Sequence, residues 1–243
     1  LPDMLDKAGY RSSIIGKWHL GLEPENHPCR RGFDFFRGFL GDMMDDYYTH
    51  LRHGNNYMRE NEREIDPDGH ATDLFTEWAT EVLEREAQND APFFLYLAYN
   101  APHTPIQPPQ EWYEYVRDRE PDISEKRARY LALVEHMDSG IGQVLEALKE
   151  TGQLDNTLVF YTSDNGGQKR VGACNGGIRG NKGDVYEGGI RVPTCAMWSG
   201  HIQEGSCTDQ KTMHIDIFPT LCELAGVEFE HEIEGVPVTD TLY

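Results

Sequence analysis

The sequence lacks long hydrophobic runs and is poor in basic residues. Its most apolar stretch, FFLYLAY, is far shorter than the roughly 20 residues that a helix needs to span a bilayer. Only 22 lysines and arginines stand against 42 aspartates and glutamates, which gives a formal charge of −20. This balance argues against nucleic acid or an anionic membrane as the main partner. An anion-binding site must therefore be a local group of basic side chains in an acidic protein.

Familiar zinc and phosphate motifs are also missing. The five cysteines include no C-x-x-C pair, which argues against a zinc site, and their spacing does not determine any disulfide. No GxxxxGK[ST] pattern is present, so the chain has no phosphate-binding P-loop of that type. At 243 residues the chain is long enough to bury one large core, and we expect a single domain over residues 1–243.

Helical and extended patterns alternate along the chain. Apolar residues recur every three or four positions in two segments, which predicts amphipathic helices over 72–87 and 124–150. A shorter helix is predicted to begin near Pro219 and to end at Gly226. Apolar runs predict strands in YRSSIIG, APFFLYLAY (expected to be buried) and NTLVFYT, and residues 22–70 read as a long irregular stretch. The alternation predicts an α/β fold with a mainly parallel sheet between helices on both faces.

Three polar clusters each follow one of the predicted strands: GKWHLG, NAPHTP and SDNGG. The carboxyl ends of strands in open α/β sheets line the ligand crevice. We therefore expect these three clusters to contribute to one shared site.

The SDNGG cluster offers two hard oxygen donors. Asp164 supplies a carboxylate and Asn165 an amide carbonyl, a composition that suits Ca²⁺ or Mg²⁺. The alternative is an Asx turn that merely ends the strand. Two oxygen ligands cannot fill a shell of six to eight, so a metal ion here needs further ligands.

The remaining candidates are two lysines and two histidines. Lys17 and His19 are two residues apart, so in an extended backbone both side chains point to the same side. His103 lies between prolines, and Lys182 lies in a glycine-rich stretch. Singly, each has an ordinary structural explanation. Together with Asp164, they describe a site that cleaves an ester of a tetrahedral oxyanion, where cations bind the charged group and an imidazole protonates the departing oxygen.

The order of these motifs resembles the type I sulfatases of the alkaline phosphatase superfamily. The resemblance extends over essentially the whole chain, is nearest to arylsulfatase B-like or N-acetylgalactosamine-sulfatase-like members, and rests on six segments: AGYRSSIIGKWHLG, RGFDFFRGF, APFFLYLAYNAPHTP, NTLVFYTSDNGG, RGNKGDVYEGGIRVP and HIDIFPTLCELAG. It implies an alkaline-phosphatase-like fold and hydrolysis of sulfate monoesters, with a sulfated small molecule or glycan as the substrate. It also implies an extracytoplasmic location.

The resemblance implies a role for each candidate residue. Lys17 would contact the sulfate and the nucleophile, and His19 would be the base that releases the covalently held sulfate. His103 and Lys182 would hold the sulfate and assist the leaving oxygen. Asp164 and Asn165 would complete a Ca²⁺ site, with Mg²⁺ as the less favoured ion.

The chain departs from the family at the nucleophile. Type I sulfatases convert a cysteine or serine in a C/S-x-P-x-R motif to formylglycine, and no such motif occurs in residues 1–243. We therefore expect the chain to be the central part of a sulfatase, incomplete at both ends, and inactive by itself. Two alternatives remain: a non-catalytic protein that binds sulfated glycans, and a phosphodiesterase or phosphonate hydrolase of the same superfamily. The oligomeric state cannot be read from the sequence.

Overall fold

The computed structural model describes residues 1–242 and contains a mixed central sheet. Its strand order is β6-β5-β2-β1-β7, and β2, β1 and β7 are parallel while β5 and β6 run antiparallel to their neighbours. The strands are β1 (Arg11–Lys17), β2 (Phe35–Phe39), β3 (Leu51–Arg52), β4 (Asn55–Asn56), β5 (Met58–Glu60), β6 (Arg63–Glu64), β7 (Phe93–Ala98), β8 (Val159–Thr162) and β9 (Thr194–Met197). The pairs β3–β4 and β8–β9 form two small separate antiparallel sheets.

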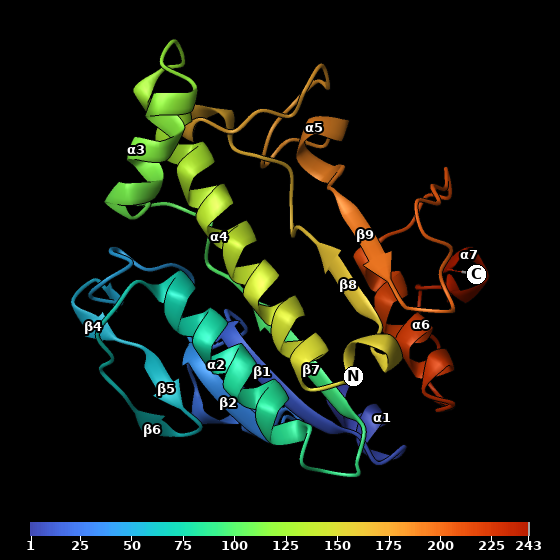
Figure 1. Ribbon diagram of the computed structural model, residues 1–243. Helices are drawn as coiled ribbons and strands as arrows, with labels where there is room; N and C mark the ends of the chain where they lie inside the picture. The colour runs from blue at the N-terminus through green and yellow to red at the C-terminus, as the bar shows by residue number, and fades with distance from the viewer. Residues whose placement is uncertain (243) are drawn as a thin grey trace.

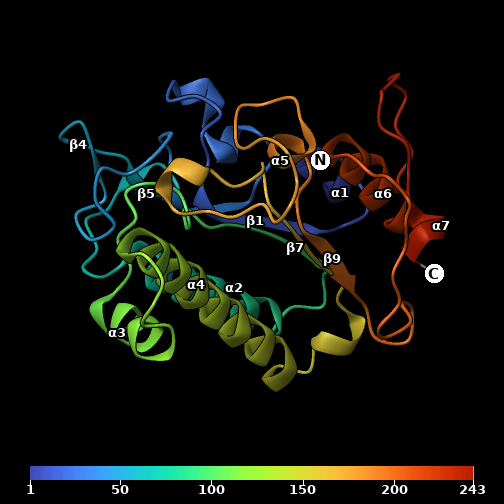
Figure 2. The same cartoon turned by 90° about the horizontal axis from the view of Figure 1, so that it is seen from above.

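The two long helices, α2 and α4, cover one face of the central sheet (Figure 1). The helices are α1 (Pro2–Asp6), α2 (Ala71–Glu86), α3 (Gln110–Arg119), α4 (Glu125–Glu150), α5 (Glu187–Ile190), α6 (Ile217–Leu224) and α7 (Thr239–Leu242). Short 3-10 turns are η1 (Pro24–Asn26), η2 (Pro28–Arg30), η3 (Leu154–Asn156), η4 (Lys169–Val171) and η5 (His214–Asp216). Seen from above, α1 and α6 lie on the opposite side of the strands from α2 and α4 (Figure 2). Helices therefore flank the strands on both sides, as predicted.

The main core lies between the sheet and the helices α2 and α4. Ile15 in β1 packs with Phe75 and Trp78 of α2 and with Leu133 of α4, and all four side chains are at most 2% exposed. Alternation along β1 turns Ile14 to the other face, where it packs with residues of a smaller cluster around η2 and β2. Burial of these large apolar side chains is the main term that stabilises the fold.

The strand β8 does not join the central sheet. It pairs only with β9 among the described residues, so the expectation that all three polar clusters follow strands of one sheet is wrong in this detail. The α4 helix bridges the two sheets, because Leu148 belongs to one cluster that also includes Leu95 of β7 and Val159 of β8. This shared packing keeps the ends of β7 and β8 in one region of the molecule.

The structure corrects three further expectations. Residues 22–70 are not irregular throughout, because they contain β2 and the short strands β3 to β6. The helix predicted to begin near Pro219 begins two residues earlier, at Ile217, because it continues directly from the 3-10 turn η5. The strand β7 is not fully buried, since Tyr96 on the face away from α2 is 48% exposed.

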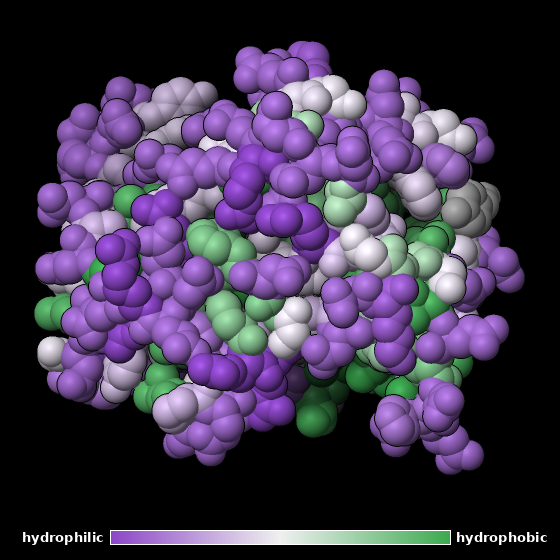
Figure 3. Space-filling view, turned by 90° about the horizontal axis from the view of Figure 1, so that it is seen from below, coloured by the Kyte–Doolittle hydropathy of each residue, from purple (hydrophilic) through white to green (hydrophobic). Residues whose placement is uncertain are grey.

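The surface reflects the acidic composition. The lower face is mainly hydrophilic, with scattered hydrophobic patches (Figure 3). Among the described residues, no helix combines the length and apolar character that a membrane span requires.

Candidate active site

Lys17 is the last residue of β1 and lies where the strand meets its neighbours most closely. Gly16, just before it, has a φ of 106°, and a Cβ at this position would collide with the carbonyl of Ala98 in β7. Only glycine fits there, so the backbone delivers the Lys17 side chain right at the carboxyl edge of the sheet. Burial lowers the pKa of Lys17, Lys182 lowers it further, and the carboxylates of Asp164 and Asp42 oppose this effect.

His103 lies in the loop that follows β7. The buried Tyr47 hydroxyl donates to the His103 carbonyl at 2.9 Å, which anchors the loop to the core. The Nδ1 atom of His103 lies 3.0 Å from the carbonyl oxygen of Thr104, and since a carbonyl only accepts, Nδ1 carries the proton. No described residue hydrogen-bonds to Nε2, which is therefore available to a ligand.

The charges around His103 favour its neutral form. Burial lowers the pKa of His103, and the positive charges of Lys182 and Lys17 lower it further. The Thr104 carbonyl and the Asp164 carboxylate act in the opposite direction.

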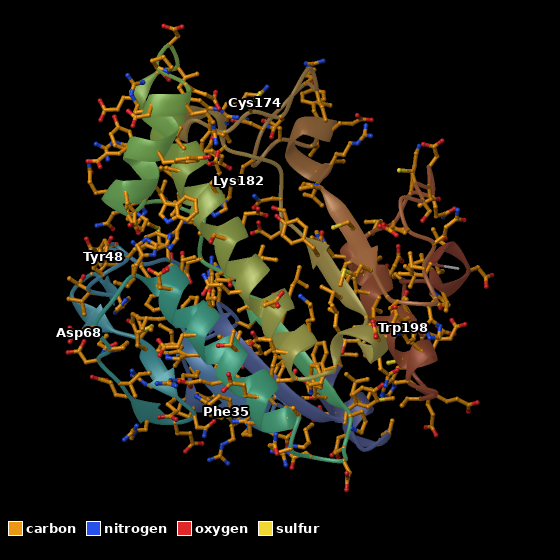
Figure 4. All side chains as sticks on the ribbon, viewed as in Figure 1. Phe35, Tyr48, Asp68, Cys174, Lys182 and Trp198 are labelled. Carbon is orange, nitrogen blue, oxygen red and sulfur yellow. The ribbon has the colours of Figure 1, made fainter. Side chains whose placement is uncertain are left out.

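Lys182 is carried by a loop that folds against the SDNGG turn. The amide N–H of Lys182 donates to the Gly167 carbonyl at 3.3 Å, and the Asn175 side chain bonds both the N–H and the carbonyl of Gly167, at 2.9 and 3.0 Å. Figure 4 shows Lys182 in this loop, ahead of α5. The loop therefore positions the lysine relative to the turn at residues 163–167.

Asp164 and Asn165 meet part of the requirement for a hard cation. The Asp164 carboxylate is exposed and makes no hydrogen bond or ion pair with any residue from 1 to 242. The Asn165 amide nitrogen donates to the Gly166 carbonyl at 3.2 Å, which leaves Oδ1 without a donor from the described chain. Two free oxygens on consecutive residues fit the donor type of a Ca²⁺ or Mg²⁺ shell, and the rest of the shell must come from elsewhere.

His19 differs from the other candidates. Its φ is 58°, so the extended backbone assumed for the Lys17–His19 pair does not continue through His19, and that part of the prediction is wrong. The side chain is exposed, and the His19 N–H donates to the Leu40 carbonyl at 3.2 Å. A positive φ at a non-glycine residue costs energy and often occurs at functional sites.

The structure thus brings four of the predicted residues into mutual electrostatic range. Lys17, His103, Lys182 and Asp164 come from four separate loops or strand ends, and the charges of Lys182 and Asp164 act on both Lys17 and His103. Asn165 adjoins Asp164, and no such coupling connects His19 to the group among the interactions described.

A second polar cluster, which we call the closed cluster, was not predicted. It consists of His70, Asp73 and His136, whose ligand atoms lie within 4.8 Å of one another, so the composition could hold a metal ion. However, Nδ1 of His70 accepts the Thr72 N–H at 3.2 Å, and its Nε2 donates to the Gln107 carbonyl at 3.0 Å. A neutral imidazole has one lone pair, and the start of α2 already uses that of His70.

The closed cluster therefore connects elements of the fold. The Nε2 atom of His136 in α4 lies 2.6 Å from Oδ1 of Asp73 in α2, and His70 joins them by ring contact with His136 at 4.8 Å between centroids. A metal ion could bind His70 only after the hydrogen bond from the Thr72 N–H to Nδ1 of His70, which caps α2, had broken.

Other residues near the site also went unnoticed in the sequence. Asp42 acts on Lys17 and forms a two-bond pair with Arg52, at 2.9 Å for each bond. Tyr96 feels the charge of Asp164, which raises its pKa after the larger effect of burial. His214 contacts the residues just before Asp164. The sequence carries no local signal for these contacts, because none of them joins neighbouring residues.

Comparison with known proteins identifies the family. The sulfatase family model matches residues 1–227. Arylsulfatase J of Mus musculus is 34% identical over 255 residues, which cover all of this chain and 42% of that protein. N-acetylgalactosamine-6-sulfatase of Homo sapiens is 33% identical over 259 residues, which cover all of this chain and 48% of that protein. The chain belongs to the sulfatase family.

The solved structures agree with this assignment. The crystal structure of Ps i-CgsB in complex with k-i-k-neocarrahexaose superposes with a TM-score of 0.92 at 32% identity, over 99% of this chain and 56% of that chain. The predicted family and the predicted α/β, alkaline-phosphatase-like fold are confirmed. The chain spans about half the length of the curated relatives it matches.

Proposed function

We propose that this chain carries the anion-binding part of an active site that hydrolyses sulfate monoesters. The observation that supports it most is the mutual coupling of Lys17, His103, Lys182 and Asp164 at the ends of separate strands and loops. Two ammonium groups and an imidazole lie within electrostatic range of one another and of a carboxylate that has no partner in the described chain. That arrangement suits a small tetrahedral anion and a divalent cation bound together.

The two lysines bind the charged group in this proposal. Burial is the main cause that lowers the pKa of Lys17, Lys182 lowers it further, and the carboxylates of Asp164 and Asp42 oppose these effects. A sulfate ester brings negative charge to both ammonium groups, so binding offsets the repulsion between Lys17 and Lys182. Electrostatic stabilisation of this kind is usually the largest single term in such reactions.

His103 protonates the leaving oxygen in the same proposal. In the free protein, burial and the two lysines favour the neutral imidazole. A bound anion offsets the lysine charges, so the imidazole takes up a proton on Nε2, the atom without a partner in the described chain. Because Nδ1 is fixed on the Thr104 carbonyl, the ring is already oriented to present Nε2.

Asp164 and Asn165 would hold a Ca²⁺ ion, which supplies charge that polarises the sulfate oxygens. Mg²⁺ is the less favoured ion in this proposal. The formylglycine motif is not present in residues 1–243, so we derive no step through that group. His19 is retained as a proposed base on the strength of the family resemblance and its unusual backbone conformation.

A sulfated carbohydrate is the proposed substrate class. One similar structure was solved with a neocarrahexaose, and one relative is named N-acetylgalactosamine-6-sulfatase. Both names refer to carbohydrates, which favours a glycan over an aryl or steroid sulfate. The proposal includes an extracytoplasmic location, as the resemblance implies.

Turnover by the complete protein, as its gene encodes it, tests the proposal. We expect Ca²⁺-dependent release of 4-nitrophenol from 4-nitrophenyl sulfate, much faster than from the matching phosphodiester. We also expect release of sulfate from a sulfated oligosaccharide, measured by ion chromatography. Faster turnover of the diester would favour the phosphodiesterase alternative, and glycan binding without turnover would favour the binding protein.

Two lysines of the same loop region provide a matched pair of variants. Lys182→Met should lower kcat/KM by about 100-fold, because it removes a charge that acts on the reacting group. Lys169→Met should leave kcat/KM unchanged, since Lys169 is exposed in η4 and does not act on Lys17 or His103. Equal effects of the two substitutions would contradict the assignment of Lys182.

A further inference from the structure

His214 reaches across the sequence to the strand that leads to Asp164. It lies in η5, about 50 residues beyond the end of β8, and its Nε2 atom lies 3.0 Å from the Ser163 carbonyl oxygen and 3.3 Å from Thr162 Oγ1. A carbonyl oxygen only accepts, so Nε2 carries the hydrogen and donates it to Ser163. Ser163 directly precedes Asp164, which connects His214 to the proposed cation ligands.

The turn that carries Asp164 is bonded to the rest of the chain on both of its sides. The strand β8 has four residues and pairs only with β9 among the described strands. Within the turn, the Ser163 hydroxyl donates to the Asn165 carbonyl at 3.1 Å, and the Gly166 N–H donates to the Gly189 carbonyl at 2.9 Å. The Gly166 bond and the bonds of Lys182 and Asn175 to Gly167 hold the side of the turn after Asp164, and His214 holds the side before it.

The segment that carries His214 is itself firmly held. Asp216 is 7% exposed, and its carboxylate accepts the N–H groups of Met213 at 2.7 Å and Val236 at 3.0 Å. The Thr220 hydroxyl donates to the Asp216 carbonyl at 2.6 Å and accepts the Val238 N–H at 3.0 Å. Because its backbone is fixed on both sides, His214 loses little further freedom when it bonds Ser163.

We propose that His214 is a positioning residue for the divalent cation: its hydrogen bond to the Ser163 carbonyl sets the placement of Asp164 and Asn165. The inference rests on the proposed function, because it takes Asp164 and Asn165 as cation ligands. Groups that orient metal ligands raise affinity by pre-organising them, and their loss commonly weakens metal binding 10- to 100-fold, roughly. Since His214 is exposed and acts through the backbone, we expect an effect near the lower end of this range.

Calorimetric titration of the complete protein with Ca²⁺ tests this inference without relying on activity. His214→Leu should weaken Ca²⁺ binding by about tenfold. His214→Gln should bind within about threefold of the wild type, because the glutamine Nε2 can occupy the position of the imidazole Nε2. His214→Asn should resemble the leucine variant, because its shorter amide does not reach Ser163. The Ca²⁺-induced rise in Tm provides a second measurement on the same four proteins.

Thr220→Val is the matched control for stability. It removes the two hydrogen bonds of the Thr220 hydroxyl, which hold the segment after His214, and it leaves the His214–Ser163 bond in place. It should therefore lower Tm and keep the Ca²⁺ affinity of the wild type. Wild-type Ca²⁺ affinity in His214→Leu would overturn the inference. Equal loss of Ca²⁺ affinity in His214→Leu and Thr220→Val would also overturn it, and so would a His214→Gln variant that binds Ca²⁺ as weakly as His214→Leu. Asp164→Asn separates the two proposals: if it leaves Ca²⁺ binding unchanged, the proposed cation site itself is wrong.

Discussion

The closed cluster and the candidate active site contain similar residue types in opposite states. In the closed cluster, both nitrogens of His70 have partners, and His136 is 5% exposed. In the candidate site, Nε2 of His103 and the carboxylate of Asp164 have no partner in the described chain. The first group bonds mostly to itself and to the backbone, with the buried Nδ1 of His136 as an exception within the described chain. The second group leaves these two polar atoms free for a ligand.

The difference shows that proximity of ligand-type side chains is a poor guide to a binding site by itself. The ligand atoms of the closed cluster lie within 4.8 Å of one another, but the lone pair of His70 serves α2, and the bond between His136 and Asp73 joins α4 to α2. In the candidate site, the free atoms belong to charged or titratable groups that lie near other charges, which is what a charged ligand requires. Satisfied polar groups stabilise a fold, and accessible unsatisfied ones can bind a ligand.

The largest expected effect separates the two clusters by activity. In the complete protein, Lys17→Met should lower kcat/KM for 4-nitrophenyl sulfate by roughly 100- to 1,000-fold, because it removes a charge directed at the ester. The Tm should change little, since burial and Lys182 disfavour the Lys17 charge in the free protein while Asp164 and Asp42 favour it. A parallel loss of Tm and activity would show that Lys17 serves the fold instead.

The closed cluster should make the free energy of unfolding depend on pH below pH 6.5. Burial lowers the pKa of His70 from 6.5 to about 4, so neutral His70 stabilises the folded state fully above pH 6.5. This contribution is lost as the pH falls from 6.5 toward 4, and it amounts to about 3 kcal/mol. In His70→Asn, which keeps a side-chain acceptor for the Thr72 N–H, the free energy of unfolding should fall less over this range.

Urea unfolding of wild type and variant at pH 7 and at pH 4.5 gives this difference directly. Carboxylates that titrate in both proteins cancel in the comparison. Identical pH dependence of the two proteins would contradict the assigned burial of a neutral imidazole at position 70.

A smaller effect should appear in the titration of His103. Burial is the main cause of its lowered pKa, and Lys182 is the largest of the charges that lower it further. Lys182→Met should therefore raise the pKa of His103 toward the ordinary value, as followed by the NMR shifts of its ring protons. Lys169→Met should leave that pKa unchanged, and a lower pKa in Lys182→Met would have the wrong sign for the proposed site.

The helices were the part of the fold that local pattern predicted best. The periodic segments 72–87 and 124–150 correspond to α2 and α4 within one residue at each end, because one-faced apolar spacing reports directly on burial against a sheet. The strand β2 was missed because FFRGF shows no alternation: it lies between β1 and β5. The separate β8–β9 pair was missed since pairing partners depend on tertiary packing.

The candidate site was predicted in outline for a similar reason. Polar residues that follow strands lie at one edge whenever the strands run in the same direction, which holds for Lys17 and His103. The partners that position them could not be predicted, because contacts such as His214 with Ser163 or His136 with Asp73 join residues more than 50 positions apart. His19 was misread because a strand was extended past its last residue.

The smallest expected effect is an absence of change, and it tests the closed cluster most strictly. Zinc prefers imidazole nitrogen, so a true metal triad at His70, Asp73 and His136 would bind Zn²⁺ tightly. We expect Zn²⁺ to give the same calorimetric titration and the same shift in Tm in wild type and in His136→Leu, because His70 has no free lone pair to contribute. Tight Zn²⁺ binding that disappears in His136→Leu would show that the ion can displace the Thr72 N–H from His70, and the contrast between a closed and an open cluster would then fail.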